Sequence, residues 1–147
     1  MLFRSQPASL GKHPDVARLF PNFRQLEREM FVKHKIFPIM HLIALNRKFH
    51  ERNPWVANSL FRAFVEAKEK AAERLRYAGS LCTMLPWQIE EMAEVDEVFG
   101  GDAFPYGVEA NRPTLEALIK HMVEQNFIAK PIPLEELFLK TPGAMGH

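Results

Sequence analysis

The segment Ile36-Phe37-Pro38-Ile39-Met40-His41-Leu42-Ile43-Ala44-Leu45 decides the fold prediction, because both of its alternating faces are apolar. A strand that is covered on both sides has this pattern. Pro38 cannot donate a ladder hydrogen bond, so we expect the paired part to span 39–45. One strand cannot form a sheet, and we therefore expect partner strands in a missing part of the chain or in another subunit. The alternative is a buried helical segment in an all-α domain, which Pro38 disfavours.

Helical patterns lie on both sides of this segment. Apolar residues recur at spacings of three and four, and proline and glycine mark the ends. The patterns predict a helical turn at 15–20 and helices over 22–34, 53–77, 85–99, 111–125 and 134–139. Asn53 before Pro54 is typical of a capped helix start. We therefore predict an α/β chain that is mostly helical, with one main strand.

Composition excludes several classes of protein and selects none. The chain has 147 residues, of which 47% are hydrophobic and 25% charged, and a domain of this length usually buries roughly 68–70% of its unfolded surface. The 19 basic and 18 acidic residues leave a net charge of +1, which gives no reason to expect nucleic acid or an anionic membrane as a partner. Cys82 is the single cysteine, so an intrachain disulfide is excluded. A cytoplasmic location fits, as would a disulfide-free periplasmic one.

The ends of the chain differ from its middle. Residues 1–5 lack the apolar run of a signal peptide, and 1–14 are predicted to be loop or an N-terminal remnant. We expect residues 15–139 to form the folded part and 140–147 to be a flexible tail.

Standard catalytic and metal-binding signatures are absent from the sequence. It has no phosphate-binding glycine loop, no HExxH and no CxxC pair, so no metal site is expected. Cys82 is expected to be a small buried residue. The acidic residues of 90–97 could bind a cation, but a solvated helix face is the simpler interpretation.

Two groups of residues could carry chemistry. His41 lies inside the apolar segment, where it is either a core histidine or a proton-transfer group tuned by burial. The stretch 105–113 combines a phenol, a carboxylate, an amide and a guanidinium next to a helix start. Asn111 could simply cap that helix, whereas a helix N-terminus with Arg112 could bind a carboxylate.

Five strings in order form a specific pattern: RLFP at 18–21, IFPIMH at 36–41, ERNPWV at 51–56, MLPW at 84–87 and PYGVEANR at 105–112. Together they resemble the C-terminal portion of the 4,5-dihydroxyphthalate decarboxylase family, over about residues 6–138. The resemblance implies a type-2 periplasmic-binding-protein fold, with two α/β lobes around a ligand cleft. It also implies a longer protein, with 39–45 as a crossover strand and its partner strands in the N-terminal part.

The resemblance implies removal of CO₂ from 4,5-dihydroxyphthalate, which leaves protocatechuate. This chemistry needs an acid, an acceptor for a phenol hydroxyl and a cation for the retained carboxylate; it requires no electron-sink cofactor, because the hydroxyl groups activate the ring. From chemical type, we expect His41 to transfer the proton, Glu109 to orient His41 or accept from the phenol, and Arg112 to bind the carboxylate. The remaining substrate-binding candidates are Asn111, Tyr106, Phe37, Met40 and Trp87.

A second class of function is a non-catalytic solute-binding protein for a small organic anion, because the implied fold mostly serves that purpose. Fold and motif also do not determine the substrate. A small aromatic carboxylate is the expected partner, without nucleic acid or membrane. An open strand edge predicts weak stability or self-association of the isolated chain, and a homo-oligomer is one form that this could take.

Overall fold

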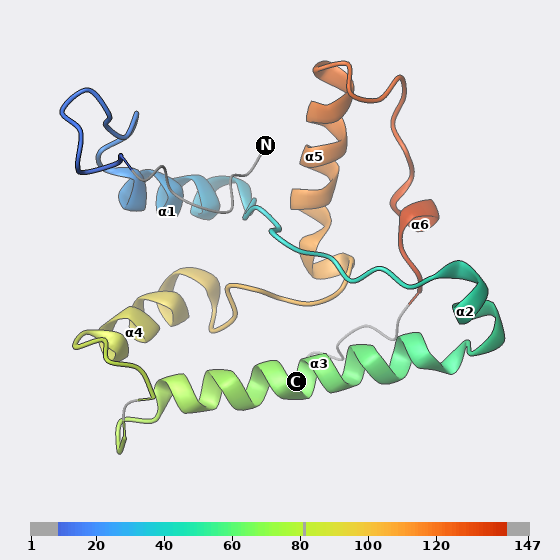
Figure 1. Ribbon diagram of the computed structural model, residues 1–147, viewed down its shortest axis with the longest axis horizontal. Helices are drawn as coiled ribbons and strands as arrows, with labels where there is room; N and C mark the ends of the chain where they lie inside the picture. Colours follow the sequence, from blue (N-terminus) through green and yellow to red (C-terminus); the bar gives the residue numbers. More distant parts are fainter. Residues whose placement is uncertain (1–8, 81, 141–147) are drawn as a thin grey trace.

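The computed structural model describes residues 9–80 and 82–140, which form helices joined by turns and extended segments (Figure 1). The elements are α1 (Phe23–His34), α2 (Arg47–Arg52), α3 (Trp55–Arg76), α4 (Gln88–Phe99), the 3₁₀ helix η1 (Glu109–Asn111), α5 (Arg112–Glu124) and α6 (Leu134–Leu137). No strand occurs in these described ranges. The predicted α/β class, and with it the periplasmic-binding-protein-like arrangement around a main strand at 39–45, is therefore wrong.

The predicted strand is extended, but it crosses the molecule alone between α1 and α2 (Figure 1). A strand requires backbone pairing with a neighbour, and residues 39–45 have no backbone hydrogen bond to any other described segment. The alternative of a buried helical segment is wrong too, because residues 35–46 are not helical and Met40, Leu42 and Ile43 are 55%, 68% and 63% exposed; its all-α class does agree with the described elements, which are all helical. An apolar sequence alone thus produced neither a sheet nor a buried helix.

The long helix α3 and the shorter α4 pack against each other at a tight corner (Figure 1). Gln88 at the start of α4 is buried and donates to the Leu75 carbonyl at 2.7 Å, while its amide oxygen bonds the Thr83 hydroxyl. Arg76 at the end of α3 donates to Asp96 at 2.5 Å. The corner is therefore held by polar groups that satisfy one another.

Ion pairs attach α1 to α4. Arg24 binds Glu91 through two bonds of 2.9 and 2.8 Å and also binds Glu94. Arg28 continues the series, to Glu94 at 3.2 Å and Glu97 at 2.6 Å. The hydrogen bond from Arg24 lowers the pKa of Glu94. The acidic face that we expected to be solvated is thus largely paired with arginine.

Four phenylalanine rings join α1, α4 and the segments that follow them. The Phe37 ring lies 6.3 Å from Phe31, 5.2 Å from Phe99 and 5.5 Å from Phe104, measured between ring centroids, and all three pairs have edge-to-face geometry. Phe31 and Phe99 are 4.4 Å apart. Edge-to-face contact is favourable for aromatic pairs, so these rings contribute to holding the connected segments together.

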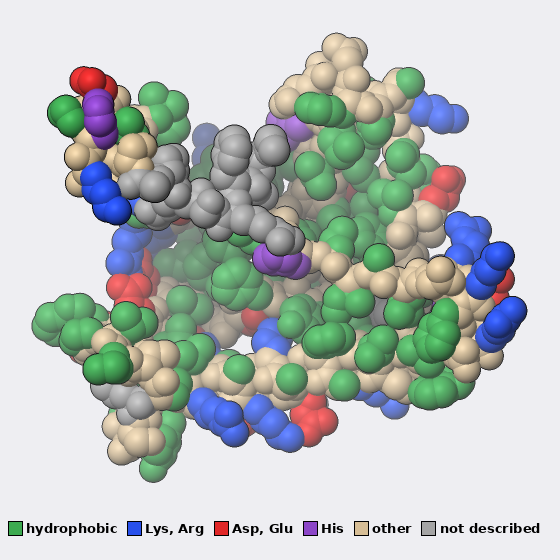
Figure 2. All heavy atoms as spheres, in the orientation of Figure 1, with side chains coloured by type: hydrophobic (Ala, Val, Ile, Leu, Met, Phe, Trp, Pro, Cys, Tyr) green, Lys and Arg blue, Asp and Glu red, His purple; other side chains and the backbone are tan. Residues whose placement is uncertain are grey.

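The buried core is small. Leu115 and Leu134 are the apolar residues below one-tenth exposure in the described ranges. The chain exposes 12558 Å², whereas a compact protein of 17.0 kDa exposes about 7,700 Å². About half of the unfolded surface is therefore buried, not the 68–70% expected from length. Figure 2 shows the consequence, with hydrophobic side chains spread over the visible face.

Local signals predicted most helices well, as the bounds of α1, α3, α4, α5 and α6 confirm. The turn predicted at 15–20 is not helical, and α2 was not predicted although Asn46 accepts a hydrogen bond from the Phe49 amide as its N-cap. Asn53 does not cap α3, since no side-chain cap hydrogen bond forms at that end; its amide nitrogen donates to the Phe49 carbonyl of α2.

The helices in the described part of the chain are all too short or too polar to cross a membrane. The predicted N-terminal loop and C-terminal tail fall largely on 1–8 and 141–147, which lie outside the described residues.

Candidate functional site

The loop that leads into α5 is shaped by Asn111. Its side-chain amide donates to the carbonyl oxygens of Pro105 and Gly107, at 2.7 and 2.9 Å. Gly107 has a φ of 100°, which glycine adopts without strain. Asn111 makes no side-chain cap hydrogen bond to α5, so the simple capping role does not hold. Instead, Asn111 holds the loop in a defined shape beside its charged neighbours.

Glu109 and Arg112 form a two-bond ion pair at the end of this loop. Arg112 Nε and Nη2 lie 3.1 and 2.6 Å from the two carboxylate oxygens of Glu109. This hydrogen bonding lowers the pKa of Glu109 and raises that of Arg112. Arg112 also reaches Glu116 at 3.5 Å and Glu135 at 3.4 Å. Glu109 is therefore an ionised acceptor at neutral pH, and Arg112 is shared among three carboxylates.

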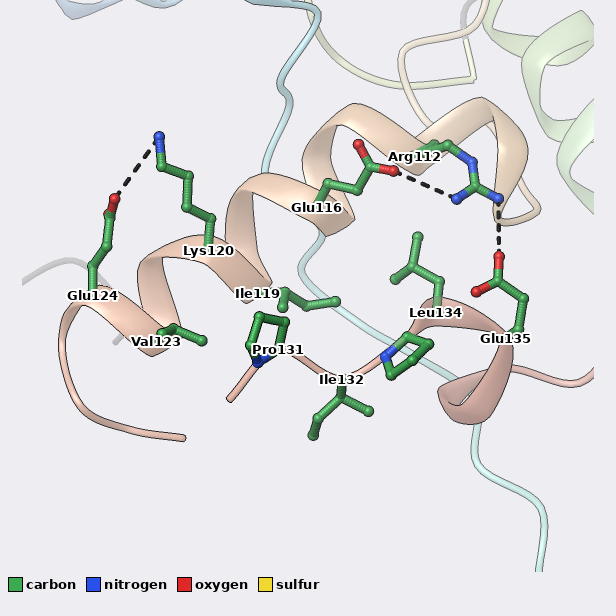
Figure 3. A pocket seen from close by; sticks show the side chains of 11 residues that line it. Arg112, Glu116, Ile119, Lys120, Val123, Glu124, Pro131, Ile132, Leu134 and Glu135 are labelled. Atoms are coloured by element: carbon green, nitrogen blue, oxygen red, sulfur yellow. Dashed lines mark hydrogen bonds and ion pairs between the residues drawn. The ribbon is translucent and has the colours of Figure 1, made fainter. Parts of the chain in front are cut away.

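An open groove of about 460 Å³ begins at Arg112 and runs along α5 (Figure 3). Ile119 and Val123 of α5 form one side of it, and the segment 131–134 faces them across the groove (Figure 3). Glu135 lies at the same end as Arg112 (Figure 3). The groove was not predicted, because its two walls are separate segments whose apolar residues looked like ordinary core.

His41 lies in the exposed extended segment, next to exposed Met40. Among the described residues, no hydrogen bond or ion pair joins its ring to Glu109 or Arg112. The segment is nevertheless tied to α5, because the Phe37 amide donates to the Thr114 hydroxyl at 3.1 Å. The structure thus brings the backbone before His41 to the start of α5, without a direct contact between the two predicted catalytic side chains.

Tyr106 is placed by a lysine that the sequence did not single out. Lys68 Nζ lies 4.6 Å from the centre of the Tyr106 ring, a distance at which a cation is attracted to the ring face. Lys68 also bonds Asp102 at 2.5 Å and the Phe104 carbonyl at 3.2 Å. Nothing local in the sequence indicates this contact, because Asp102 lies more than 30 residues from Lys68.

Phe37 and Trp87 occupy different surroundings. The Phe37 ring packs into the aromatic group described above. Trp87 immediately precedes α4 and is 70% exposed. The length of α4, about 18 Å, separates Trp87 from the segment that leads to the loop at 105–111. The structure does not bring these two rings together.

Two further predictions concern reactive groups. Cys82 is exposed, so the prediction that it is buried is wrong. No cluster of histidine, cysteine or acidic side chains suited to a metal ion occurs within residues 9–80 and 82–140.

Comparisons with known proteins give one relationship. No protein-family model matches the chain. Among curated proteins, it is similar to 4,5-dihydroxyphthalate decarboxylase of Comamonas testosteroni, with 25% identity over 126 residues. The similarity covers 86% of this chain and 38% of that protein. It supports a distant relationship, in which this chain spans less than half of its relative's length.

Proposed function

We propose that the protein to which this chain belongs is a carboxy-lyase that converts 4,5-dihydroxyphthalate to protocatechuate in the breakdown of aromatic acids. The observation that carries the proposal is the similarity to a 4,5-dihydroxyphthalate decarboxylase over 86% of the chain. Because the chain spans 38% of this relative, the activity is proposed for the whole protein.

The reaction breaks the bond between a ring carbon and one carboxylate. The carboxylate leaves as CO₂, its bonding electron pair stays on the ring carbon, and a proton takes its place there. The phenol hydroxyl groups donate electron density to the ring, and they do so more strongly when each O–H donates a hydrogen bond to an acceptor. The second carboxylate is unchanged, and a positioned cation can hold it through both steps.

Arg112 is suited to hold the retained carboxylate. A guanidinium has five donors, of which the two closest bonds go to Glu109. The contacts to Glu116 and Glu135 are longer, at 3.5 and 3.4 Å, and a substrate carboxylate can replace either of them. Glu109 stays ionised beside Arg112 and is proposed as the acceptor of a hydrogen bond from a phenol hydroxyl. In this proposal Arg112 binds the retained carboxylate and Glu109 binds a phenol hydroxyl, while the two remain paired with each other.

His41 is the proposed proton donor, on a segment that is tethered to the start of α5 through Thr114. An imidazole can donate and accept protons near neutral pH, which the reaction requires. Productive geometry needs the ring within about 3 Å of the substrate atom that it protonates. Of the other predicted contacts, Asn111 and Tyr106 would be polar, and Phe37 and Met40 would be apolar. Trp87 is not kept among them, because it lies at the opposite end of α4 from the Phe99 ring on which Phe37 packs.

The test is decarboxylation by the full-length protein and its variants His41→Gln, Glu109→Gln and Arg112→Lys. Release of CO₂ and formation of protocatechuate are followed from 4,5-dihydroxyphthalate. Removal of a general acid or base lowers the rate by about 10²–10⁴-fold, which we expect for the first two variants. Arg112→Lys keeps the charge but loses the two-bond geometry, so we expect mainly a higher KM.

Matched controls are His121→Gln and Glu66→Gln, which remove the same side chains from exposed positions outside the proposed site. They should retain wild-type activity. Near-wild-type decarboxylation by both His41→Gln and Glu109→Gln would refute the assigned roles. Absence of any CO₂ from the wild-type full-length protein would refute the function itself.

The described residues contain no strand, so the fold favours neither the enzyme nor the solute-binding alternative. The similarity to a decarboxylase is what favours the enzyme. The same incubation distinguishes the two: a binding protein returns the aromatic acid unchanged. A cytoplasmic location is proposed together with the enzyme; the single cysteine fits this location and a periplasmic one equally, and cell fractionation distinguishes them.

A further inference from the structure

The rim of the α5 groove carries charges of alternating sign. Arg112, Glu116, Lys120 and Glu124 follow one another at intervals of four residues along one side of the helix (Figure 3). Within the chain, Arg112 lies 3.5 Å from Glu116 and Lys120 lies 3.8 Å from Glu124. Each interval is about 6 Å along the helix axis, so the ladder extends over about 18 Å.

This ladder is complementary to itself when it is reversed. In the order plus, minus, plus, minus, an antiparallel copy presents minus, plus, minus, plus. A two-fold axis midway between Glu116 and Lys120 places Arg112 opposite Glu124 of the second copy and Glu116 opposite its Lys120. The same two pairs recur on the other side of the axis, as a two-fold interface requires.

We propose that the groove face of α5 is a docking surface for a second copy of this chain, bound antiparallel about a two-fold axis. Ile119 and Val123 line the groove directly beside the ladder, and the segment 131–134 faces them (Figure 3). The methylene stems of Glu116 and Lys120 from the second copy would cover these apolar side chains while their charged ends pair at the rim. The interface thus has an apolar centre and a polar edge.

Charge favours a second copy as the occupant, because the ladder is complementary to its own reversed copy. The net charge of +1 causes almost no repulsion between two copies at long range.

The experiment uses sedimentation velocity on the 147-residue chain over a range of concentrations. In a Lys120→Glu dimer, the new carboxylate at 120 faces Glu116 of the other copy, and this repulsive pair occurs twice. In a Glu116→Lys dimer, the new ammonium group at 116 faces Lys120 of the other copy, also twice. Each variant alone should dissociate at least about tenfold more readily than the wild type, since two attractive pairs become repulsive. An equimolar mixture of the two variants restores both attractive pairs and should recover the dimer.

Lys70→Glu is the matched control, because Lys70 pairs with Glu66 on α3 at the same four-residue spacing and similar exposure. It should leave association unchanged. Far-UV circular dichroism checks that each variant is helical. If charge reversal unfolds the chain, the neutral variants Lys120→Gln and Glu116→Gln are used in place of the charge-reversed ones and should weaken association. Added salt should also weaken association of the wild type.

Three outcomes would overturn the proposal. The wild-type chain could remain a monomer at all concentrations. Association could persist unchanged in Lys120→Glu and Glu116→Lys, or in their neutral replacements, which would assign it to another surface. The mixture of folded charge-reversed variants could also fail to associate, which would remove the basis in complementary charge.

Discussion

Replacing Phe37 by alanine tests whether this ring is structural or part of a ligand site. The ring makes three edge-to-face contacts, at centroid distances of 6.3, 5.2 and 5.5 Å. Each such pair contributes about 0.5–1.5 kcal/mol beyond burial, and partial burial of the ring contributes roughly 1 kcal/mol more. Phe37→Ala should therefore lower the free energy of unfolding by about 3 kcal/mol, which lies at the low end for a phenylalanine truncation.

Urea denaturation followed by far-UV circular dichroism measures this change. Phe37→Leu keeps most of the apolar area and loses the ring geometry, so its cost should be clearly smaller than that of alanine. The control is Phe127→Ala, whose side chain is 73% exposed and which should change stability by less than about 0.5 kcal/mol. Equal stability of Phe37→Ala and the wild type would refute the structural role and leave the ring available to line a ligand site.

Three other predictions follow from described contacts. The hydrogen bond from Arg24 lowers the pKa of Glu94 below 4.5. The ionised Glu94 therefore stabilises the folded chain fully above pH 4.5, and this stabilisation is lost as the pH falls through the lowered pKa. Glu94→Gln should reduce the dependence of the melting temperature on pH in the acid range. Gln88→Ala removes the buried donor to a helix carbonyl and should cost about 1–3 kcal/mol in urea denaturation. The double variant Leu42→Ser and Ile43→Thr removes exposed apolar surface, so the folded chain should bind less of the dye ANS, and unchanged binding would contradict the exposed segment.

Helices were predictable where their signals lie within a few residues. Gly100 ends α4 in the left-handed conformation, with a φ of 69°, as its place after the apolar pattern predicts. The N-terminal signal at Asn46 was equally local, and α2 could have been predicted from it. Asn53 shows the limit of such signals, because its side-chain amide donates to the Phe49 carbonyl of α2 and its oxygen accepts no hydrogen bond from the first turn of α3.

The candidate site was predictable only in part. Glu109 and Arg112 are three residues apart on one helical turn, and their pairing follows from that spacing. The position of His41 relative to them depends on the path of an extended segment, which no local pattern specifies. The same holds for Lys68 and Tyr106, whose contact requires α3 and a distant loop to meet.

The sequence by itself determined the helices and the short-range pairs, because spacing, caps and prolines act over one or two turns. Only the tertiary structure decided what the apolar segment 39–45 and the charged faces contact. Arg28 and Glu94, for example, are 66 residues apart and pair because α1 lies against α4. Strand formation has the same dependence, since a ladder needs a second backbone at hydrogen-bonding distance. No described segment supplies one, and the residues that looked most like a strand remain extended and exposed.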